Sequence, residues 1–310
     1  MQPIPTIAVV GATGQFGHPL TLHLAAEGAE VLAISREASE RNRTKLKALE
    51  QAGCRLGFCA DPTDEAALAT LLEGCDTVVM VTRVSPESLA TLDPLYLNAA
   101  KRAGVRRFVP NEFGAHTLGM ERGISELFDA KKNMHDRIDA AGLEKTLIYP
   151  GLNMDYCLPN FRLWHQITTF GDLDLPLTTH HIDDIGVISA RAIVDPRTIG
   201  KAVQLYANRL SQREMIALLK QSWPEKEFPV THISRESILK DMKQGSDEIT
   251  GKAGVETDRK RAQINYVCYL TGQVTNIGHP DTLNASELYP DFVYRTPAEM
   301  LSDAAFVFGP

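Results

Sequence analysis

The chain has 310 residues, of which 44% are hydrophobic and 23% charged, as is typical of a globular protein with a sizeable core. Its formal net charge of -7 argues against binding to nucleic acid or to an anionic membrane surface. No apolar run approaches the ~20 residues that cross a bilayer, and the first residues show no signal-type segment, so a cytoplasmic location is expected. The five cysteines include no C-x-x-C pair, which predicts reduced thiols rather than disulfides or a zinc site.

Strands and helices are predicted to alternate from residue 5 to about residue 150. The strands are expected at Ile7–Val10, Glu30–Ile34, Arg55–Cys59, Thr77–Thr82, Arg107–Pro110 and Thr146–Tyr149. The helices are expected at Pro19–Glu27, Arg41–Ala52, Asp64–Leu72, Leu92–Ala103 and Ser125–Ala141. This alternation predicts the α/β class, with a doubly wound parallel sheet and right-handed crossovers.

After Pro150 the predicted elements become shorter, and prolines and glycines become more frequent. A helix, a strand and a second helix are expected at His181–Val194, Val203–Tyr206 and Gln212–Gln221. Asp183 or Asp184 could cap the first of these helices. Residues 240–262 are strongly polar, which predicts a mobile loop. Residues 151–310 are therefore interpreted as a smaller substrate-binding region, with segments that return to the main sheet.

The stretch IAVVGATGQFG, from Ile7 to Gly17, predicts a dinucleotide site. An apolar strand is followed at once by Gly11, Gly14 and Gly17, and then by a helix. Glycines here permit a sharp turn, let the backbone approach a pyrophosphate and let the helix pack closely on the strand. The spacing is G-x-x-G-x-x-G, and the alternative is an ordinary glycine-rich turn. The strand–turn–helix context favours the dinucleotide site.

The end of the second strand bears on the choice of cofactor. Many NAD enzymes place Asp or Glu there, whereas this chain has Arg36, which can pair with the 2′-phosphate of NADP. Lys45 could add a second positive charge. A solvated surface role is the alternative for Arg36, and Asp61 is either a neighbour of the adenine or a turn residue. NADPH is the predicted cofactor, and residues 1–150 are assigned to an NADP-binding Rossmann domain.

The chain contains no Tyr-x-x-x-Lys pair of the kind used by common short-chain dehydrogenases, so another proton donor is needed. Lys131 and Lys132, in the segment FDAKKNMHDR, follow the fifth strand and start near the ligand-binding edge of the sheet. A lysine beside an apolar pocket and a cationic nicotinamide would have a lowered pKa and could exchange protons near neutral pH. His135 and His116 are weaker candidates, and two adjacent lysines can also be simply solvated.

Two further groups of residues leave alternatives open. His180, His181, Asp183 and Asp184 have the chemistry of metal ligands, but no distant third ligand pattern accompanies them, so a structural role is favoured and no metal is predicted. Three aromatic residues could line a flat aromatic pocket or belong to the core: Phe161, Trp164 and Phe170.

Several separated motifs resemble, in order, those of the isoflavone reductase-like family. This family includes the pinoresinol–lariciresinol, isoflavone and phenylcoumaran benzylic ether reductases, within the atypical short-chain dehydrogenase (NmrA-like) group. The motifs are VVGATGQFG, SRE with Lys45 nine residues after Arg36, AAKRAGVRRFVPNEFG, FDAK, DDIG, DPRTIGKAVQL and ASELYPDFVYRT. The match extends over nearly the whole chain.

The resemblance implies roles for individual residues. The cofactor turn would comprise Gly11, Thr13, Gly14, Gln15, Phe16 and Gly17. The loop beside the nicotinamide would comprise Pro110, Glu112, Phe113 and Gly114. Arg36 and Lys45 fall on the 2′-phosphate site, and Lys131 falls on the family's catalytic lysine with Lys132 as its neighbour.

The sequence departs from the plant pattern near the expected pocket, which leaves the substrate less defined than the cofactor. Asn111 replaces a serine, Arg83 stands where a glycine usually ends the fourth strand, residues 149–153 differ, and residues 240–262 look longer than usual.

These observations predict an NADPH-dependent reductase that transfers hydride to an aromatic substrate of phenylpropanoid, lignan or isoflavonoid type, with Lys131 as general acid/base. One alternative is an NmrA-like redox sensor that binds dinucleotide without catalysis. Another is a reductase of a polyketide-type aromatic in secondary metabolism. The expected partner is a small aromatic molecule rather than nucleic acid or membrane, and a homodimer is left open.

Overall fold

The computed structural model describes residues 4–246, 257–274 and 279–309. Its main sheet has six parallel strands in the order β3-β2-β1-β4-β5-β6. The strands are β1 (Thr6–Val10), β2 (Glu30–Ser35), β3 (Arg55–Phe58), β4 (Thr77–Met80), β5 (Arg107–Val109) and β6 (Glu144–Lys145). The strand order reverses between β1 and β4, which is the place where doubly wound sheets bind ligands. The predicted fold class is confirmed.

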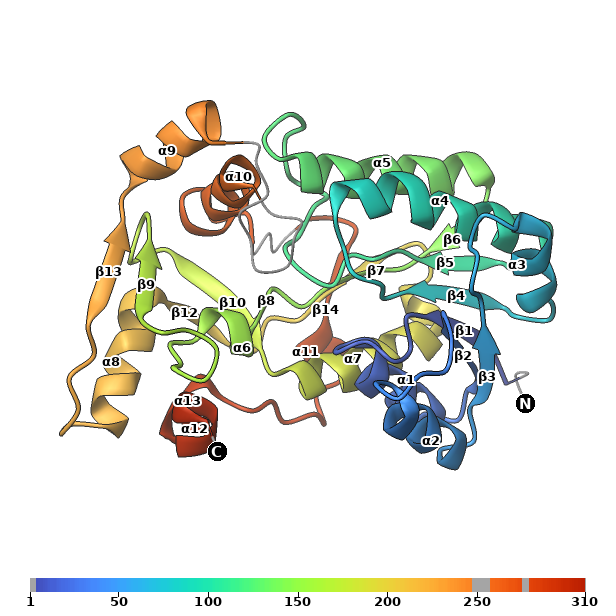
Figure 1. Cartoon of the computed structure of the whole chain (residues 1–310), viewed down its shortest axis with the longest axis horizontal. Helices are drawn as coiled ribbons and strands as arrows, with labels where there is room; N and C mark the ends of the chain where they lie inside the picture. The colour runs from blue at the N-terminus through green and yellow to red at the C-terminus, as the bar shows by residue number, and fades with distance from the viewer. Residues whose placement is uncertain (1–3, 247–256, 275–278, 310) are drawn as a thin grey trace.

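Helices cover both faces of this sheet (Figure 1). One face carries α1 (Gly17–Ala26), α2 (Arg43–Gln51) and α7 (Ile182–Val194), and the other carries α3 (Glu65–Leu71), α4 (Pro86–Arg102) and α5 (Glu126–Ala141). Each face of the sheet packs against its helices in a separate hydrophobic core. Alternate residues of β1 belong to these two cores, because successive side chains of a strand point to opposite faces. Ile7 and Val9 pack toward α1 and α7, whereas Ala8 and Val10 pack toward α4 and α5.

The sixth strand differs from the prediction. The apolar run at β7 (Leu147–Tyr149) does not pair with β5; it pairs with β11 (Ala202–Gln204), which in turn pairs with β14 (Thr282–Asn284). The strand beside β5 is β6, whose Glu-Lys sequence carries no hydrophobic signal because its pairing rests on backbone hydrogen bonds. Thr146 alone separates β6 from β7, so the three-stranded sheet of β7, β11 and β14 begins one residue after the last strand of the main sheet.

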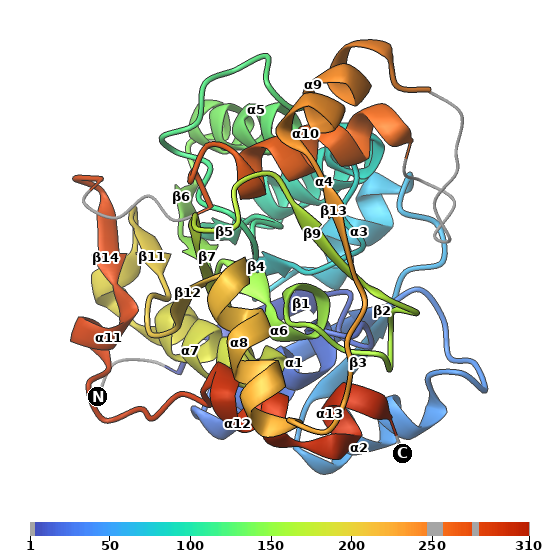
Figure 2. The ribbon, with the colours of Figure 1, turned by 90° about the vertical axis from the view of Figure 1, so that its left-hand side faces the viewer.

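Most of the remaining elements lie beside the carboxyl ends of the main strands (Figure 1). Two small sheets are formed by β8 (Leu152–Asn153), β10 (Pro176–His180) and β12 (Arg209–Ser211), and by β9 (Ile167–Phe170) and β13 (Val230–Ile233). The helices are α6 (Met154–Cys157), α8 (Gln212–Ser222), α9 (Arg235–Gln244), α10 (Asp258–Tyr269), α11 (Ala285–Leu288), α12 (Pro297–Ser302) and α13 (Ala304–Phe308), with a 3-10 turn at Pro196–Thr198. Figure 2 shows β9 and β13 side by side below α9 and α10.

Three predicted boundaries need correction. Helix α4 begins at Pro86 rather than Leu92, because Ser85 and Ser88 form a capping box ahead of it. Helix α7 is capped by His181, and the two aspartates proposed as caps lie in its first turn. The predicted loop at 240–262 is partly helical: α9 continues to Gln244 and α10 begins at Asp258, while residues 247–256 lie outside the described residues.

None of the helices in the described ranges is both long enough and apolar enough to cross a membrane. All five cysteines are free thiols.

Candidate active site

The turn between β1 and α1 leaves no room for side chains at two of its glycines. A Cβ on Gly11, whose φ is +94°, would lie 2.7 Å from the carbonyl oxygen of Val81 at the end of β4. A Cβ on Gly17 would lie 2.1 Å from the carbonyl oxygen of Gly11. No side chain caps the N-terminus of α1, so the helix offers backbone N–H groups to an anion. This cradle fits a pyrophosphate.

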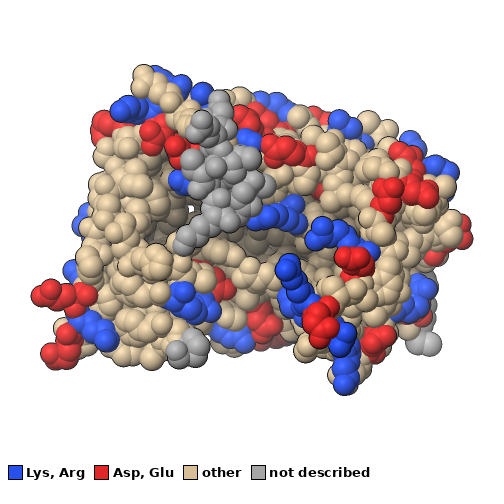
Figure 3. All heavy atoms as spheres, in the orientation of Figure 1, with Lys and Arg blue, Asp and Glu red and all other residues tan. Residues whose placement is uncertain are grey.

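Positive side chains stand next to this turn. The Lys45 ammonium donates to the carbonyl oxygens of Thr13 and Gly14, at 3.0 and 3.3 Å, and so ties α2 to the turn. Arg36 is exposed directly after β2. Figure 3 shows Lys and Arg side chains gathered along the hollow of this face. Asp61 accepts hydrogen bonds from the Thr63 backbone N–H and hydroxyl. These contacts are those of a turn residue, the second of the two roles considered for it.

The loop after β5 forms the inner wall of a cavity of about 1010 Å³. Asn111 donates its amide to the Thr82 carbonyl at 2.8 Å, which fastens the loop to the end of β4. The ring of Phe113 lies 4.7 Å from that of Phe16, and both line the cavity together with Gln15. Four of the residues predicted at the cofactor thus face this space: Gln15, Phe16, Phe113 and Gly114.

Behind the loop lies a buried polar cluster that sequence reasoning assembled only in part. The Glu112 carboxylate, 1% exposed, is 2.6 Å from the His135 ring nitrogen and 3.7 Å from the Lys131 ammonium nitrogen. Lys131 also donates to the Glu112 backbone carbonyl, and the Thr117 hydroxyl donates to the carboxylate at 3.3 Å. Asp93, on α4, is fully buried, and neither carboxyl oxygen has a hydrogen-bond partner among the described residues.

The environment shifts the pKa values in this cluster. Burial lowers the pKa of Lys131 despite the opposing charges of Glu112 and Asp93. Burial also works to raise the pKa of Glu112, but the charges of Lys131 and His135 outweigh it and hold that pKa below its ordinary value. Burial raises the pKa of Asp93 to about 7, with Lys131 opposing the rise. Burial thus favours the neutral forms of Lys131 and Asp93, whereas the neighbouring charges favour the ionised form of Glu112.

Lys131 is not among the described residues that line the cavity; it lies behind the lining residue Gly114. A Cβ on Gly114, which does line the cavity, would be 3.8 Å from the Lys131 amine nitrogen. Glu112 likewise turns its side chain toward the cluster and away from the cavity. Lys132 points elsewhere and donates to the Met120 carbonyl. The structure thus separates the two neighbouring lysines.

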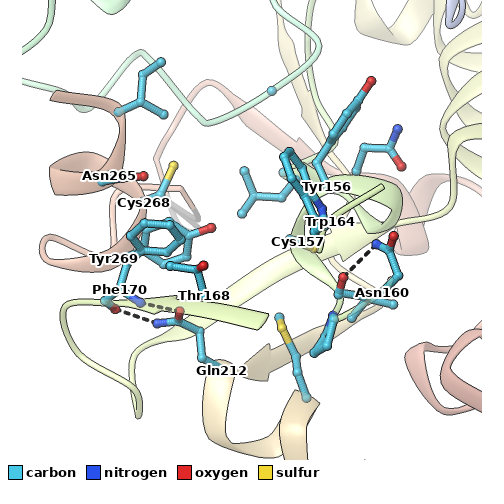
Figure 4. Close-up of a pocket in the computed structure, with 18 of the residues that line it drawn as sticks. Tyr156, Cys157, Asn160, Trp164, Thr168, Phe170, Gln212, Asn265, Cys268 and Tyr269 are labelled. Atoms are coloured by element: carbon cyan, nitrogen blue, oxygen red, sulfur yellow. Dashed lines mark hydrogen bonds between the residues drawn. The ribbon is translucent and has the colours of Figure 1, made fainter. Parts of the chain in front are cut away.

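Aromatic side chains form the other walls (Figure 4). Tyr156 and Trp164 are 55% and 46% exposed and lie on one side, and the Tyr156 hydroxyl donates to Gln15 at 2.8 Å. Across the cavity, the rings of Phe170 and Tyr269 stack at 5.0 Å. Tyr269 and the other residues of α10 that line the cavity were not predicted from the sequence. The polar segment in which this helix begins had been predicted as a loop.

Other candidates have structural roles. Phe161 packs in the core against Phe228 and Phe308. His116, whose pKa burial lowers to about 4, bonds to the Thr282 hydroxyl at 2.8 Å and joins its loop to β14. The exposed Arg83 accepts a hydrogen bond from Ser88 on its carbonyl oxygen.

The histidine–aspartate group near α7 is fully engaged with the protein. His180 contacts the Pro150 carbonyl at 2.7 Å and accepts from the Ala207 N–H. Asp183 and Asp184 both pair with Arg295. Within the described ranges no group of three or more His, Cys, Asp or Glu side chains could hold a metal ion.

A parallel sheet that reverses between β1 and β4, with a glycine turn at that point, defines an α/β protein of the Rossmann type. The chain belongs to the NmrA-like family, whose family model matches residues 4–301.

Its relatives are named reductases. Pinoresinol reductase 2 of Arabidopsis thaliana is 28% identical over 315 residues, covering 95% of each chain. Bifunctional pinoresinol-lariciresinol reductase 2 of Linum usitatissimum is 30% identical over 314 residues, covering 95% of this chain and 92% of the relative. A solved structure of AtPrR2 with NADP+ and (+)-pinoresinol has a TM-score of 0.80 at 25% identity, covering 99% of this chain and 100% of the other.

Proposed function

We propose that the protein is an NADPH-dependent reductase of an aromatic substrate of phenylpropanoid, lignan or isoflavonoid type, with Lys131 as general acid/base. One observation carries this proposal: the buried Lys131 amine, paired with Glu112, lies close behind Gly114 in the wall of the cavity. Aromatic residues line this cavity, which also borders the glycine turn. The named activities of the relatives agree with it.

The cofactor has a defined place in this proposal. The glycine turn and the uncapped start of α1 would hold the pyrophosphate, and Arg36 and Lys45 would hold the 2′-phosphate. Pro110 and Glu112 would shape the loop that supports the nicotinamide beside Phe113. NADPH, when bound, supplies the hydride. The remaining chemistry, which is proton transfer and the exclusion of water, falls to side chains of this protein.

Lys131 is suited to the proton transfer. Burial favours its neutral amine, which can take a phenolic proton from the substrate, and the nearby Glu112 carboxylate stabilises the ammonium that results. That ammonium can return a proton to an oxyanion. Gly114 lines the cavity, and because it has no side chain the Lys131 amine nitrogen can lie 3.8 Å from where its Cβ would be.

The test compares two neighbouring lysines. NADPH oxidation is measured with a panel of aromatic substrates that begins with (+)-pinoresinol and an isoflavone. Lys131→Met should lower turnover at least about 100-fold, the lower end of general acid–base contributions, while NADPH binding is unchanged. Lys132→Met removes the same charge one residue away and should retain turnover. Retained turnover in Lys131→Met would contradict the role of Lys131.

A panel that shows tight NADPH binding without turnover by the wild-type protein would contradict the reductase proposal. It would favour the alternative of a dinucleotide-binding sensor.

A further inference from the structure

Helix α10 turns one continuous face toward the cavity. Its lining residues are Arg261, Ile264, Asn265, Cys268 and Tyr269. These positions are spaced by three or four residues, so they lie on a single side of the helix. Figure 4 shows Asn265, Cys268 and Tyr269 on one wall, across the cavity from Tyr156 and Trp164.

This face changes from charged to apolar along the helix. The Arg261 side chain is 44% exposed and lies at the outer end, whereas Cys268, two turns further on, is 4% exposed. The inner end finishes at Tyr269, which stacks on Phe170. A ligand lying along α10 would meet a guanidinium at one end and the stacked rings of Phe170 and Tyr269 at the other.

Arg261 is also the only charged residue among the described residues that line the cavity. All the others are apolar, aromatic or neutral polar, and no carboxylate among them opposes an anionic ligand. Asp258, one turn earlier, is 3.5 Å from Arg261, and both side chains are nearly half exposed. A guanidinium has five N–H donors, so it can bind a ligand carboxylate as well as carboxylates of the protein.

Resting on the proposed reductase function, we infer that the substrate is an aromatic acid whose carboxylate binds Arg261 while its ring packs against the cavity wall near Tyr269. A guanidinium presents parallel N–H donors that match a planar carboxylate. The position at the mouth also attracts anions to a protein whose net charge is -7. Arg261 is then a specificity-determining residue.

The cofactor phosphates are a less suitable partner for Arg261. Helix α10 lies apart from α1 and the glycine turn before it (Figure 1), and Lys45 already contacts that turn.

The experiment uses charge-matched pairs of probes. The NADP+-saturated protein is titrated calorimetrically with benzoate, 4-hydroxycinnamate, 2-naphthoate and biphenyl-4-carboxylate, and with the methyl ester of each. At least one acid should bind about 10-fold more tightly than its ester. Arg261→Gln should reduce that preference to within about twofold without weakening the ester, and Arg261→Lys should retain part of it. Lys220→Gln, on the exposed side of α8, controls for net charge.

Three results would overturn the inference. In the first, no acid binds better than its ester, or no probe binds. In the second, the preference survives in Arg261→Gln. In the third, that variant weakens NADPH binding as strongly as acid binding, which would assign Arg261 to the cofactor. Turnover of neutral aromatics that depends on Lys131 would leave the reductase proposal intact in each case.

Discussion

The glycine turn after β1 and the buried cluster around Glu112 lie at strand ends of one sheet, yet different forces shape them. The turn consists of consecutive residues and is limited by space, since a Cβ on Gly17 would meet the Gly11 carbonyl oxygen at 2.1 Å. The cluster brings together Asp93, Glu112 and Lys131 from separate segments, and its stability depends on how these buried charges are paired. Substitutions that test the turn should therefore add volume, and substitutions that test the cluster should remove charge at constant volume.

The largest loss of folding stability is expected for Gly17→Ala. Helix α1 must move away from the turn, which should cost about 3 kcal/mol as overpacking does and abolish tight NADPH binding. Gly28→Ala is the matched control, because Gly28 has a φ of +85° but open space around it, so only backbone strain of about 1 kcal/mol applies. Urea unfolding and NADPH titration measure both effects. Equal losses in the two variants would show that crowding is not what limits the turn.

The next largest loss is expected for Glu112→Gln. The variant keeps the shape of the side chain but removes the ion pair with Lys131 and the charged hydrogen bond with His135, which should cost about 2 kcal/mol. Without the carboxylate the pKa of Lys131 should fall further, and the pH profile of kcat/KM should shift to lower pH.

Glu126→Gln, at the exposed start of α5, the helix that carries Lys131 and His135, should change stability by less than about 0.5 kcal/mol. If Glu112→Gln is as mild as this control, the cluster contributes little to the fold.

Asp93→Asn should have a smaller effect of opposite sign at pH 8. Burial raises the pKa of Asp93 from 3.8 to about 7, so folding takes up a proton and this stabilising contribution is lost as pH rises through 7. The raised pKa means that removing the buried charge at pH 8 could stabilise the fold by at most about 4 kcal/mol. The Asn amide, which would also lack a partner, offsets most of this, so the net gain in the free energy of unfolding should be about 1 kcal/mol.

At pH 5 the wild type should be more stable than Asp93→Asn, because Asp93 is then neutral in the folded protein. Urea unfolding at pH 5 and pH 8 measures both values. A variant whose stability relative to wild type is the same at the two pH values would contradict the raised pKa.

The smallest effect on folding is expected for Arg36→Gln, since Arg36 is exposed. Stability should change by less than about 0.5 kcal/mol. The Kd for NADPH should rise about tenfold through loss of a charged contact to the 2′-phosphate, while the Kd for NADH stays the same. Arg102→Gln, on the exposed surface of α4, should leave both values unchanged. Equal weakening of NADPH and NADH would place Arg36 away from the 2′-phosphate.

Much of the fold was predictable from local patterns. The first five strands were expected within a residue or two, because apolar runs bounded by turn residues mark buried parallel strands. The strand Glu144–Lys145 and the start of α10 were not predicted, since their sequences are polar and their positions depend on partners distant in the chain.

The sequence by itself determined the glycine turn at Gly11–Gly17, because a turn of consecutive residues is specified by local steric demands. It also determined the place of Arg36, directly after a strand that its own hydrophobicity defines. Only the tertiary structure decided that Lys131, and not Lys132, joins Glu112, His135 and Asp93 behind Gly114. The same holds for the α10 wall with Arg261. Burial and charge pairing between distant segments exist only after the elements pack, so no local spacing encodes them.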